Sequence, residues 1–221
     1  GARRDPGLDE GATTVAYIPE KGWFWYIPLL NDTVSVGVVA EHDYLYRETR
    51  DPEAIFRREA EGCHWIRDHL APGTYLGPMR VTGEFSYCAT QTAGDGFCLV
   101  GDAFSFLDPV FSSGVFLALK SGELAADAIH AGLDGGTITA STFDGYTRDM
   151  HHALTSFRQL VMAFYDRTFS FSEFIGAHPD LQPQLVDALV GNVFKDLRPL
   201  FDALGTFSKH TNRRPADALA T

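Results

Sequence analysis

The stretch FCLVGDAFSFLDPVFSSGVFLALKSGELAADAIHAGL, residues 97–133, is the part of the chain around which the rest can be interpreted. It predicts a short buried strand over Phe97–Val100 that stops at Gly101 and Asp102, then a tight loop, then a helix. The helix opens near Ser112–Gly114 and runs to about Ala131. Because glycine has no Cβ and the first N–H groups of a helix lack intrahelical acceptors, such a loop suits an electron-rich or anionic ligand. An ordinary strand–loop–helix connection, with Ser112 or Ser113 as N-cap, explains the same pattern.

Composition limits the function classes. With 221 residues, 45% hydrophobic and 21% charged, the chain is globular and amounts to one large domain or a domain and a half. Its 29 acidic and 18 basic residues give a net charge of −11, which argues against nucleic acid or an anionic membrane as a partner. No apolar run is long enough to span a bilayer. Three cysteines without metal-type spacing indicate reduced thiols, and we expect a cytoplasmic protein without a metal site.

The first 96 residues predict an antiparallel sheet with one helix. Three β-rich segments separated by turn signals indicate a three-stranded meander, at residues 13–19, 23–30 and 33–40. An amphipathic helix is predicted from Asp51 to Leu70, with His64 and His69 as surface residues, and a further strand from Met79 to Ala89. The predicted fold class is therefore α+β, an antiparallel sheet plus long helices.

The residues beyond 140 predict a helical region. An apolar stripe at helical spacing runs from Ser141 to about Phe169, and two short helices follow at Pro179–Val190 and Phe194–Leu204. The stripe suits core packing, and a binding wall for an apolar substrate is the alternative. Three histidines could act as acids or bases, but nothing places them near the loop: His151, His152 and His178. The predicted organisation is thus 1–96, 97–140 and 141–221.

The loop residues resemble the second flavin-binding motif of FAD-dependent monooxygenases and their relatives. The matching positions are Gly101-Asp102-Ala103, Asp108-Pro109-Val110-Phe111-Ser112-Ser113-Gly114-Val115 and Leu117-Ala118. The wording of residues 106–114 most resembles the flavin-dependent halogenases, with geranylgeranyl-reductase-like enzymes as close neighbours. The resemblance implies the C-terminal portion of an α/β FAD-binding fold of the para-hydroxybenzoate-hydroxylase type.

A second motif lies upstream, in Trp23-x-Trp25-x-Ile27-Pro28. Residues two apart share a strand face, so both indoles and Ile27 point one way and Phe24 and Tyr26 the other. Strand chemistry alone explains such aromatics, since they favour strands. However, Trp-x-Trp-x-Ile-Pro is also the motif that flavin-dependent halogenases carry between their two flavin motifs, and its order before Asp102 is the expected one.

Two features of that family have no match in these residues. The Gly-x-Gly-x-x-Gly fingerprint that holds the FAD pyrophosphate stands at the family's N-terminus. The family's active-site lysine stands there too, and no lysine here matches its context: Lys21, Lys120, Lys195 and Lys209. We therefore expect the C-terminal part of a longer enzyme, a fragment whose catalytic residues are unknown and which is inactive alone.

The resemblance implies roles for the matching positions. FAD would be bound by Gly101, Asp102, Asp108, Pro109, Ser113, Gly114 and Val115, and a chloride or bromide ion by the backbone at Ser112, Ser113 and Gly114. A flavin reductase would supply reduced FAD, which with dioxygen oxidises the halide to hypohalous acid. That oxidant halogenates an electron-rich aromatic substrate, either a small molecule or one tethered to a carrier.

One position departs from the tryptophan halogenases. Phe111 stands where they carry a glutamate that assists the substrate. A phenyl ring accepts no proton, so phenolic, pyrrolic or carrier-tethered substrates fit better than free tryptophan. Two other functions remain open: a geranylgeranyl-type flavin reductase, against which the tryptophan motif argues, and a non-catalytic module that keeps the fold.

Overall fold

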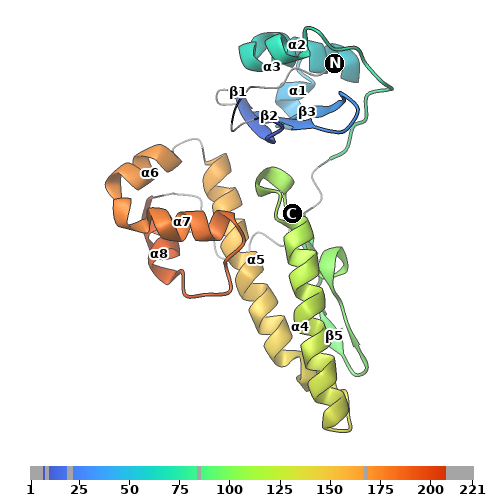
Figure 1. Cartoon of the computed structure of the whole chain (residues 1–221), viewed down its shortest axis with the longest axis vertical. Helices are drawn as coiled ribbons and strands as arrows, with labels where there is room; N and C mark the ends of the chain where they lie inside the picture. Colours follow the sequence, from blue (N-terminus) through green and yellow to red (C-terminus); the bar gives the residue numbers. More distant parts are fainter. Residues whose placement is uncertain (1–6, 8–9, 19–21, 84–85, 167–168, 208–221) are drawn as a thin grey trace. The chain divides into compact units, whose positions relative to one another are not determined.

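The computed structural model describes residues 7, 10–18, 22–83, 86–166 and 169–207. The chain divides into two compact units, residues 1–83 and 84–221, and each is described by itself (Figure 1). The division falls before the predicted boundary at residue 96, because the segment 84–96 belongs to the second unit. The functional labels of the three predicted segments stay predictions.

The first unit contains the predicted meander. Three antiparallel strands lie in the order β1-β2-β3: Thr14–Ile18, Gly22–Pro28 and Val34–Ala40. The predicted turn after β2 is confirmed, since Asn31 and Asp32 both adopt left-handed backbone angles with φ of 59° and 53°. The turn predicted at residues 20–22 lies largely outside the described residues.

A helical layer accompanies this sheet. Its elements are α1 (His42–Leu45), α2 (Pro52–Gly62) and α3 (His64–Leu70). The prediction of one helix over 51–70 is wrong, because the backbone at Cys63 is extended with φ −109° and ψ 97°. Glycine has low helix propensity, and Gly62 directly precedes the break. The start of α2 is as predicted, since Asp51 accepts a hydrogen bond from the Glu53 N–H at 3.1 Å.

The two faces of β2 differ as the alternation predicts. Phe24 and Tyr26 pack into the core of the unit together with three buried residues of α2 and α3: Phe56, Ala60 and Ile66. The prediction of a surface His69 is wrong: the residue is buried, stacks on Trp65 with ring centroids 3.6 Å apart, and its Nδ1 lies 2.8 Å from the Trp65 carbonyl oxygen. A helical spacing of four placed both rings on the buried face of α3. His64 is exposed, as predicted.

A buried carboxylate links α1 to α2. Glu59 is 4% exposed and accepts hydrogen bonds from Tyr44 Oη at 2.7 Å and Arg58 Nε at 2.8 Å. Its Oε1 also lies 2.8 Å from the Arg47 guanidinium. Burial by itself raises the pKa of Glu59, but the hydrogen bonds from Tyr44, Arg58 and Arg47 outweigh it and hold the pKa below its usual range.

Replacement of Glu59 by glutamine is expected to destabilise the first unit by about 2 kcal/mol at neutral pH, because charge-assisted hydrogen bonds are lost. A lowered folded-state pKa gives stability that is present above the unfolded pKa and lost as pH falls through the folded value. The difference between the two proteins should therefore shrink in acid.

Urea denaturation followed by tryptophan fluorescence measures this, since all three tryptophans (Trp23, Trp25 and Trp65) lie in the first unit. Glu53→Gln is the matched control, because Glu53 forms an exposed pair with Arg57 on the same helix. Its loss should change stability by about 0.5 kcal/mol or less. Equal effects of the two variants at neutral pH would contradict the assigned role of Glu59.

The second unit begins with two short antiparallel pairs. These are β4 (Tyr87–Cys88) with β7 (Ser105–Phe106), and β5 (Ala93–Gly94) with β6 (Phe97–Cys98). The strand predicted at 97–100 is two residues shorter, and the prediction that it is buried is wrong, because Phe97 is 44% exposed and Val100 is 42% exposed. The predicted strand over 79–89 is wrong for its first half, because residues 79–83 have no regular structure.

Two long helices form the body of the second unit and pack against each other (Figure 1). They are α4 (Gly114–Asp134) and α5 (Asp144–Tyr165). A 3₁₀ turn at Ala140–Phe143 leads directly into α5. Three short helices follow: α6 (Phe171–Ala177), α7 (Gln182–Leu189) and α8 (Arg198–Phe207). The helix predicted at 194–204 is shifted, because residues 191–197 are irregular.

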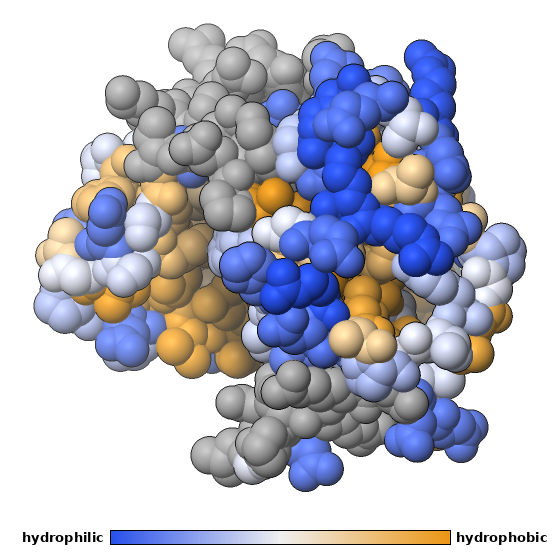
Figure 2. Space-filling view, turned by 90° about the horizontal axis from the view of Figure 1, so that it is seen from above, coloured by the Kyte–Doolittle hydropathy of each residue, from blue (hydrophilic) through white to orange (hydrophobic). Residues whose placement is uncertain are grey.

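The apolar stripe of α5 is core. Its buried members meet residues of α4 and α6–α8, which confirms the packing alternative for most of the stripe: Tyr146, Met150, Leu154, Phe157 and Leu160. None of the helices in the described ranges is long and apolar enough to cross a membrane. On the face seen in Figure 2, broad hydrophilic areas alternate with hydrophobic patches.

Candidate functional site

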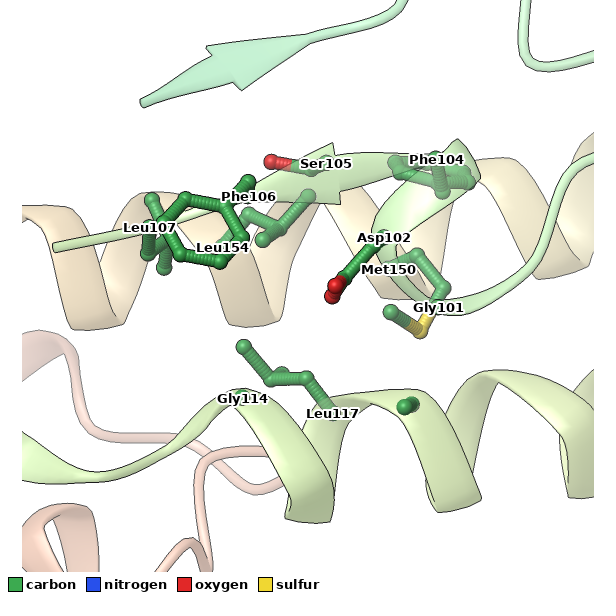
Figure 3. Close-up of a pocket in the computed structure, with 11 residues that line it drawn as sticks. Gly101, Asp102, Phe104, Ser105, Phe106, Leu107, Gly114, Leu117, Met150 and Leu154 are labelled. Atoms are coloured by element: carbon green, nitrogen blue, oxygen red, sulfur yellow. The ribbon is translucent and has the colours of Figure 1, made fainter. Parts of the chain in front are cut away.

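The predicted turn after the strand is present. Residues Gly101–Ala103 form one 3₁₀ turn, and Gly101 has φ +56°, a left-handed angle that favours glycine. A Cβ on Gly101 would lie 3.3 Å from the Ala118 Cβ, so the turn rests closely on α4. The Asp102 side chain that follows is exposed and projects into the space between this turn and α4 (Figure 3).

A small cavity lies between the turn and α4 (Figure 3). Asp102 is the one titratable side chain among its lining residues, and Ser105 adds a hydroxyl. The remaining lining is glycine or apolar: Gly101, Phe104, Phe106, Leu107, Gly114, Leu117, Ala118, Met150 and Leu154. The cavity measures about 20 Å³, room for about one water molecule.

Asp108 makes two hydrogen bonds that hold the loop between the cavity and α4. Asp108 Oδ1 accepts from the Val110 N–H at 2.9 Å, and Asp108 Oδ2 accepts from Tyr165 Oη at 3.0 Å. Pro109 opens a 3₁₀ turn that ends at Phe111. Tyr165 stands at the end of α5, so the long helix fixes the loop that the sequence motif contains.

Helix α4 starts where the sequence predicts, but no serine side chain caps it. Ser113 is the N-cap residue and is buried, yet its side chain makes no capping hydrogen bond. Ser112 adopts a left-handed angle with φ +53° and is exposed. The helix then begins at Gly114, which lines the cavity, and the first N–H groups of the helix have no intrahelical acceptor.

Phe111 packs away from the cavity wall. Its ring meets Phe164 edge-on with centroids 5.7 Å apart and Phe171 at 6.4 Å. Phe111 is not among the cavity-lining residues. It therefore anchors the loop on α5 and α6. The sequence did not reveal this role, because Phe111 was interpreted there only by the glutamate that tryptophan halogenases carry at the matching position.

The tryptophan motif belongs to the first unit. The Trp25 ring lies directly over Gly37 on β3, where a Cβ would come within 2.1 Å of the ring. Trp25 Nε1 donates to Ser35 Oγ at 3.2 Å, and the Trp23 ring stands edge-on at 6.2 Å. Ile27 pairs with Ser35, while Pro28 ends the strand. The motif thus builds one ordered aromatic face on the sheet.

Of the predicted cofactor-binding residues, three line this cavity: Gly101, Asp102 and Gly114. Asp108, Pro109, Ser113 and Val115 lie in the adjoining loop and helix start. His151 contacts the Phe104 ring, and His178 packs on Phe174, but none of the three histidines lines the cavity. Within the described ranges, no cluster of side chains suits a metal ion.

Sequence reasoning missed the residues that hold the turn and the loop. These are hydroxyl groups on neighbouring elements: Tyr87, Ser121, Tyr146 and Tyr165. Ser121 follows Ala118 by three and precedes Ala125 by four, so small residues at helical spacing marked the face of α4 that receives the turn. The tyrosines had no comparable signal, because aromatic residues at helical spacing also occur in any core.

A family model described as tryptophan halogenase matches residues 7–171. The chain belongs to the tryptophan halogenase family. Among halogenases, a "Tryptophan 2-halogenase" of Chondromyces crocatus is 37% identical over 161 residues, which cover 71% of this chain and 30% of that protein. A "1H-pyrrole-2-carbonyl-[peptidyl-carrier protein] brominase" of Pseudoalteromonas luteoviolacea is also 37% identical, over 61% of this chain and 34% of its own length.

Solved halogenase structures share the fold. The flavin-dependent brominase Bmp2 superposes with a TM-score of 0.80 at 29% identity, over 94% of this chain and 51% of the brominase chain. The antiparallel sheet and long helices are therefore a portion of an FAD-dependent halogenase fold. This halogenase-family chain spans about a third of the length of the curated relatives described above and about half of the brominase.

Proposed function

We propose that this chain forms the flavin-facing C-terminal part of an FAD-dependent halogenase. The observation that carries the proposal is the convergence of Asp102, Gly101 and the start of α4 at Gly114 on one cavity whose remaining wall is apolar. A carboxylate acceptor, unpaired helix N–H donors and a flat apolar surface are the complements of flavin hydroxyls, flavin carbonyl oxygens and the flavin ring.

The described residues fit one side of FAD. The cavity has room for about one water molecule, so the isoalloxazine ring would lie against it rather than inside it. Asp102 is exposed and can accept from a hydroxyl of the ribose or ribityl chain. Bound in reduced form, FAD supplies the electrons with which dioxygen oxidises a halide to hypohalous acid.

The residues of the loop would place the halide. In the proposal, the backbone N–H groups of Ser113 and Gly114 bind a chloride or bromide ion, since helix N-termini favour anions. The Ser112 N–H, which was also expected to bind the halide, already donates to the Pro109 carbonyl oxygen at 2.8 Å. Pro109 fixes its own φ and stiffens the loop, and Asp108 ties that loop to Tyr165. The halide site therefore rests on a rigid support.

The proposed substrate is an electron-rich aromatic ring, pyrrolic or phenolic, free or tethered to a carrier protein. Phe111 offers no proton acceptor where tryptophan halogenases carry one. A tryptophan 2-halogenase and the pyrrolyl-carrier brominase are both 37% identical to this chain, so the choice of substrate rests on Phe111 and not on the similarity.

A further polypeptide part is needed to hold the FAD pyrophosphate, and the surface of α4 supports this. An apolar stripe at alternating spacings of four and three is exposed along the helix: Val115, Leu119, Gly122, Ala126, Ile129 and Leu133. Val115 and Leu119 are 75% and 72% exposed. Large exposed apolar surfaces mark interfaces. In the proposal, a dinucleotide-binding part that also carries the catalytic lysine covers this stripe, and the cytoplasmic location stays a prediction.

The test is a halogenation assay with the natural polypeptide that contains these residues. It is given FAD, a flavin reductase with its reductant, oxygen, and either bromide, chloride or no halide. A pyrrolyl-carrier protein, a simple phenol and tryptophan are supplied as substrates, and the masses of the products are measured by mass spectrometry. Replacement of one hydrogen by the supplied halogen is the expected result. Saturation of an isoprenoid double bond without halide dependence would support the flavin reductase alternative and contradict the proposal.

A further inference from the structure

The backbone that leads into Asp102 leaves its hairpin early. β6 ends at Cys98, and the Leu99 N–H still donates to the Thr92 carbonyl at 2.8 Å. Beyond Leu99, the chain turns onto α4, and no strand in the described part of the chain pairs with its polar groups. Such groups need partners when they lie inside a protein.

Three hydroxyl groups from three different elements supply those partners. Tyr146 on α5 donates to the Leu99 carbonyl oxygen at 2.5 Å. Ser121 on α4 accepts from the Gly101 N–H at 2.8 Å. Tyr87 on β4 donates to the carbonyl oxygen of Asp102 itself. Side-chain hydroxyl groups thus bond the backbone at three of the four residues from Leu99 to Asp102: Leu99, Gly101 and Asp102.

Ser121 is the best defined of the three. It is fully buried, and its hydroxyl donates to the Ala118 carbonyl of its own helix at 2.7 Å. That donation fixes the hydroxyl rotor, so a lone pair is left aimed at the Gly101 N–H. The contact coincides with the left-handed angle of Gly101 and its close approach to Ala118, so one helix face sets both the angle and the hydrogen bond.

Tyr146 remains a donor over the whole working pH range. Its ring is buried, and this burial, followed by the nearby Cys98, raises the pKa of the Tyr146 phenol to about 12. The ring also packs edge-on against Phe104, which lines the cavity beyond Asp102. Tyr146 therefore links the backbone before Asp102 to the cavity wall after it.

We propose that Ser121, Tyr146 and Tyr87 are positioning residues, which hold the Leu99–Asp102 backbone so that the Asp102 carboxylate stays in the cavity. This inference rests on the proposed function in one respect, the identity of FAD as the ligand of Asp102. The hydroxyl contacts act on the turn whether or not flavin is present, so the turn itself can be tested separately.

The structure offers a matched control. Ser156 on α5 is also buried, and its hydroxyl also donates to the carbonyl four residues earlier, that of His152, at 3.0 Å. The resemblance ends there, because among the described residues no group from outside α5 donates to Ser156, whereas Ser121 receives the Gly101 N–H. Ser121→Ala and Ser156→Ala therefore remove the same group at similar burial, and only the first removes the bond to the turn.

The experiment uses two readouts to compare Ser121→Ala and Tyr146→Phe with the control Ser156→Ala. We call the first two the clamp variants, because each removes a hydrogen bond that holds the turn. Amide hydrogen exchange of Gly101–Phe104 is measured by mass spectrometry without flavin, and FAD affinity by titration, both in the natural polypeptide that contains these residues. Ser121→Ala and Tyr146→Phe should speed exchange in this segment at least about tenfold and weaken FAD binding about tenfold, as loss of one buried hydrogen bond would. Ser156→Ala should do neither.

Unchanged exchange in both clamp variants would overturn the proposal. It would be overturned equally if exchange rose but FAD affinity matched that of Ser156→Ala, because the hydroxyls would then shape the turn without placing Asp102. If exchange rises but the unaltered protein binds no FAD, the clamp on the turn stands and the proposed function fails.

Discussion

Gly101→Val is expected to weaken FAD binding by about a hundredfold or more. A side chain at φ +56° costs about 1–2 kcal/mol, and more when it is β-branched. The added Cβ would also lie 3.3 Å from the Ala118 Cβ, so the turn must lift away from α4. Together these effects amount to about 3 kcal/mol, which is about two decades in affinity. Titration of the natural polypeptide with FAD, followed by flavin fluorescence, measures the change.

Gly136→Val separates the two contributions. Gly136 also has a left-handed angle, φ +82°, but a Cβ there meets nothing within 4 Å, and it lies beyond the end of α4. This variant suffers similar backbone strain away from the site and should bind FAD as the unaltered protein does. If Gly101→Val bound FAD with an unaltered dissociation constant, the turn would not face the flavin.

Gly37→Ala is expected to destabilise the first unit by about 2 kcal/mol, a typical effect of overpacking. The new methyl would come within 2.1 Å of the Trp25 ring, so the indole must swing away. It would then lose its hydrogen bond to Ser35 and its edge contact with Trp23. Urea denaturation followed by tryptophan emission measures both the stability and the altered indole environment.

Gly77→Ala is the control for this prediction, since nothing lies within 4 Å of a Cβ at Gly77 and its angle is ordinary. It should leave the midpoint and the emission maximum unchanged. An unaltered midpoint and emission spectrum in Gly37→Ala would show that the Trp25 ring does not cover Gly37. The tryptophan motif would then lack the ordered face described above.

Local chemistry predicted the elements that carry strong signals. The alternation around Val36 and the Asn31-Asp32 turn gave the meander, and Asp51-Pro52 gave the start of α2, because those signals depend only on neighbouring residues. The start of α4 followed in the same way from Ser113-Gly114. The resemblance of residues 106–114 and of the Trp-x-Trp-x-Ile-Pro motif identified the family, which the comparison confirmed.

Other features depend on contacts across the fold, which periodicity does not contain. The break at Cys63 interrupts a pattern that reads as one helix, and His69 is buried because it stacks on Trp65. Residues 79–83 have strand-like composition but no partner strand in the described part of the chain. Phe111 was interpreted from the residue it replaces, whereas its position follows from Phe164 and Phe171.

The most direct measurement is the dissociation constant of FAD for the natural polypeptide with Asp102 and with Asp102→Asn. Asparagine keeps the shape of the side chain but removes the charged acceptor, so binding should weaken about tenfold. Asp127→Asn, an exposed change on the outside of α4, should leave the constant unaltered. Equal affinities of the unaltered protein and Asp102→Asn would contradict the placement of the flavin against Asp102.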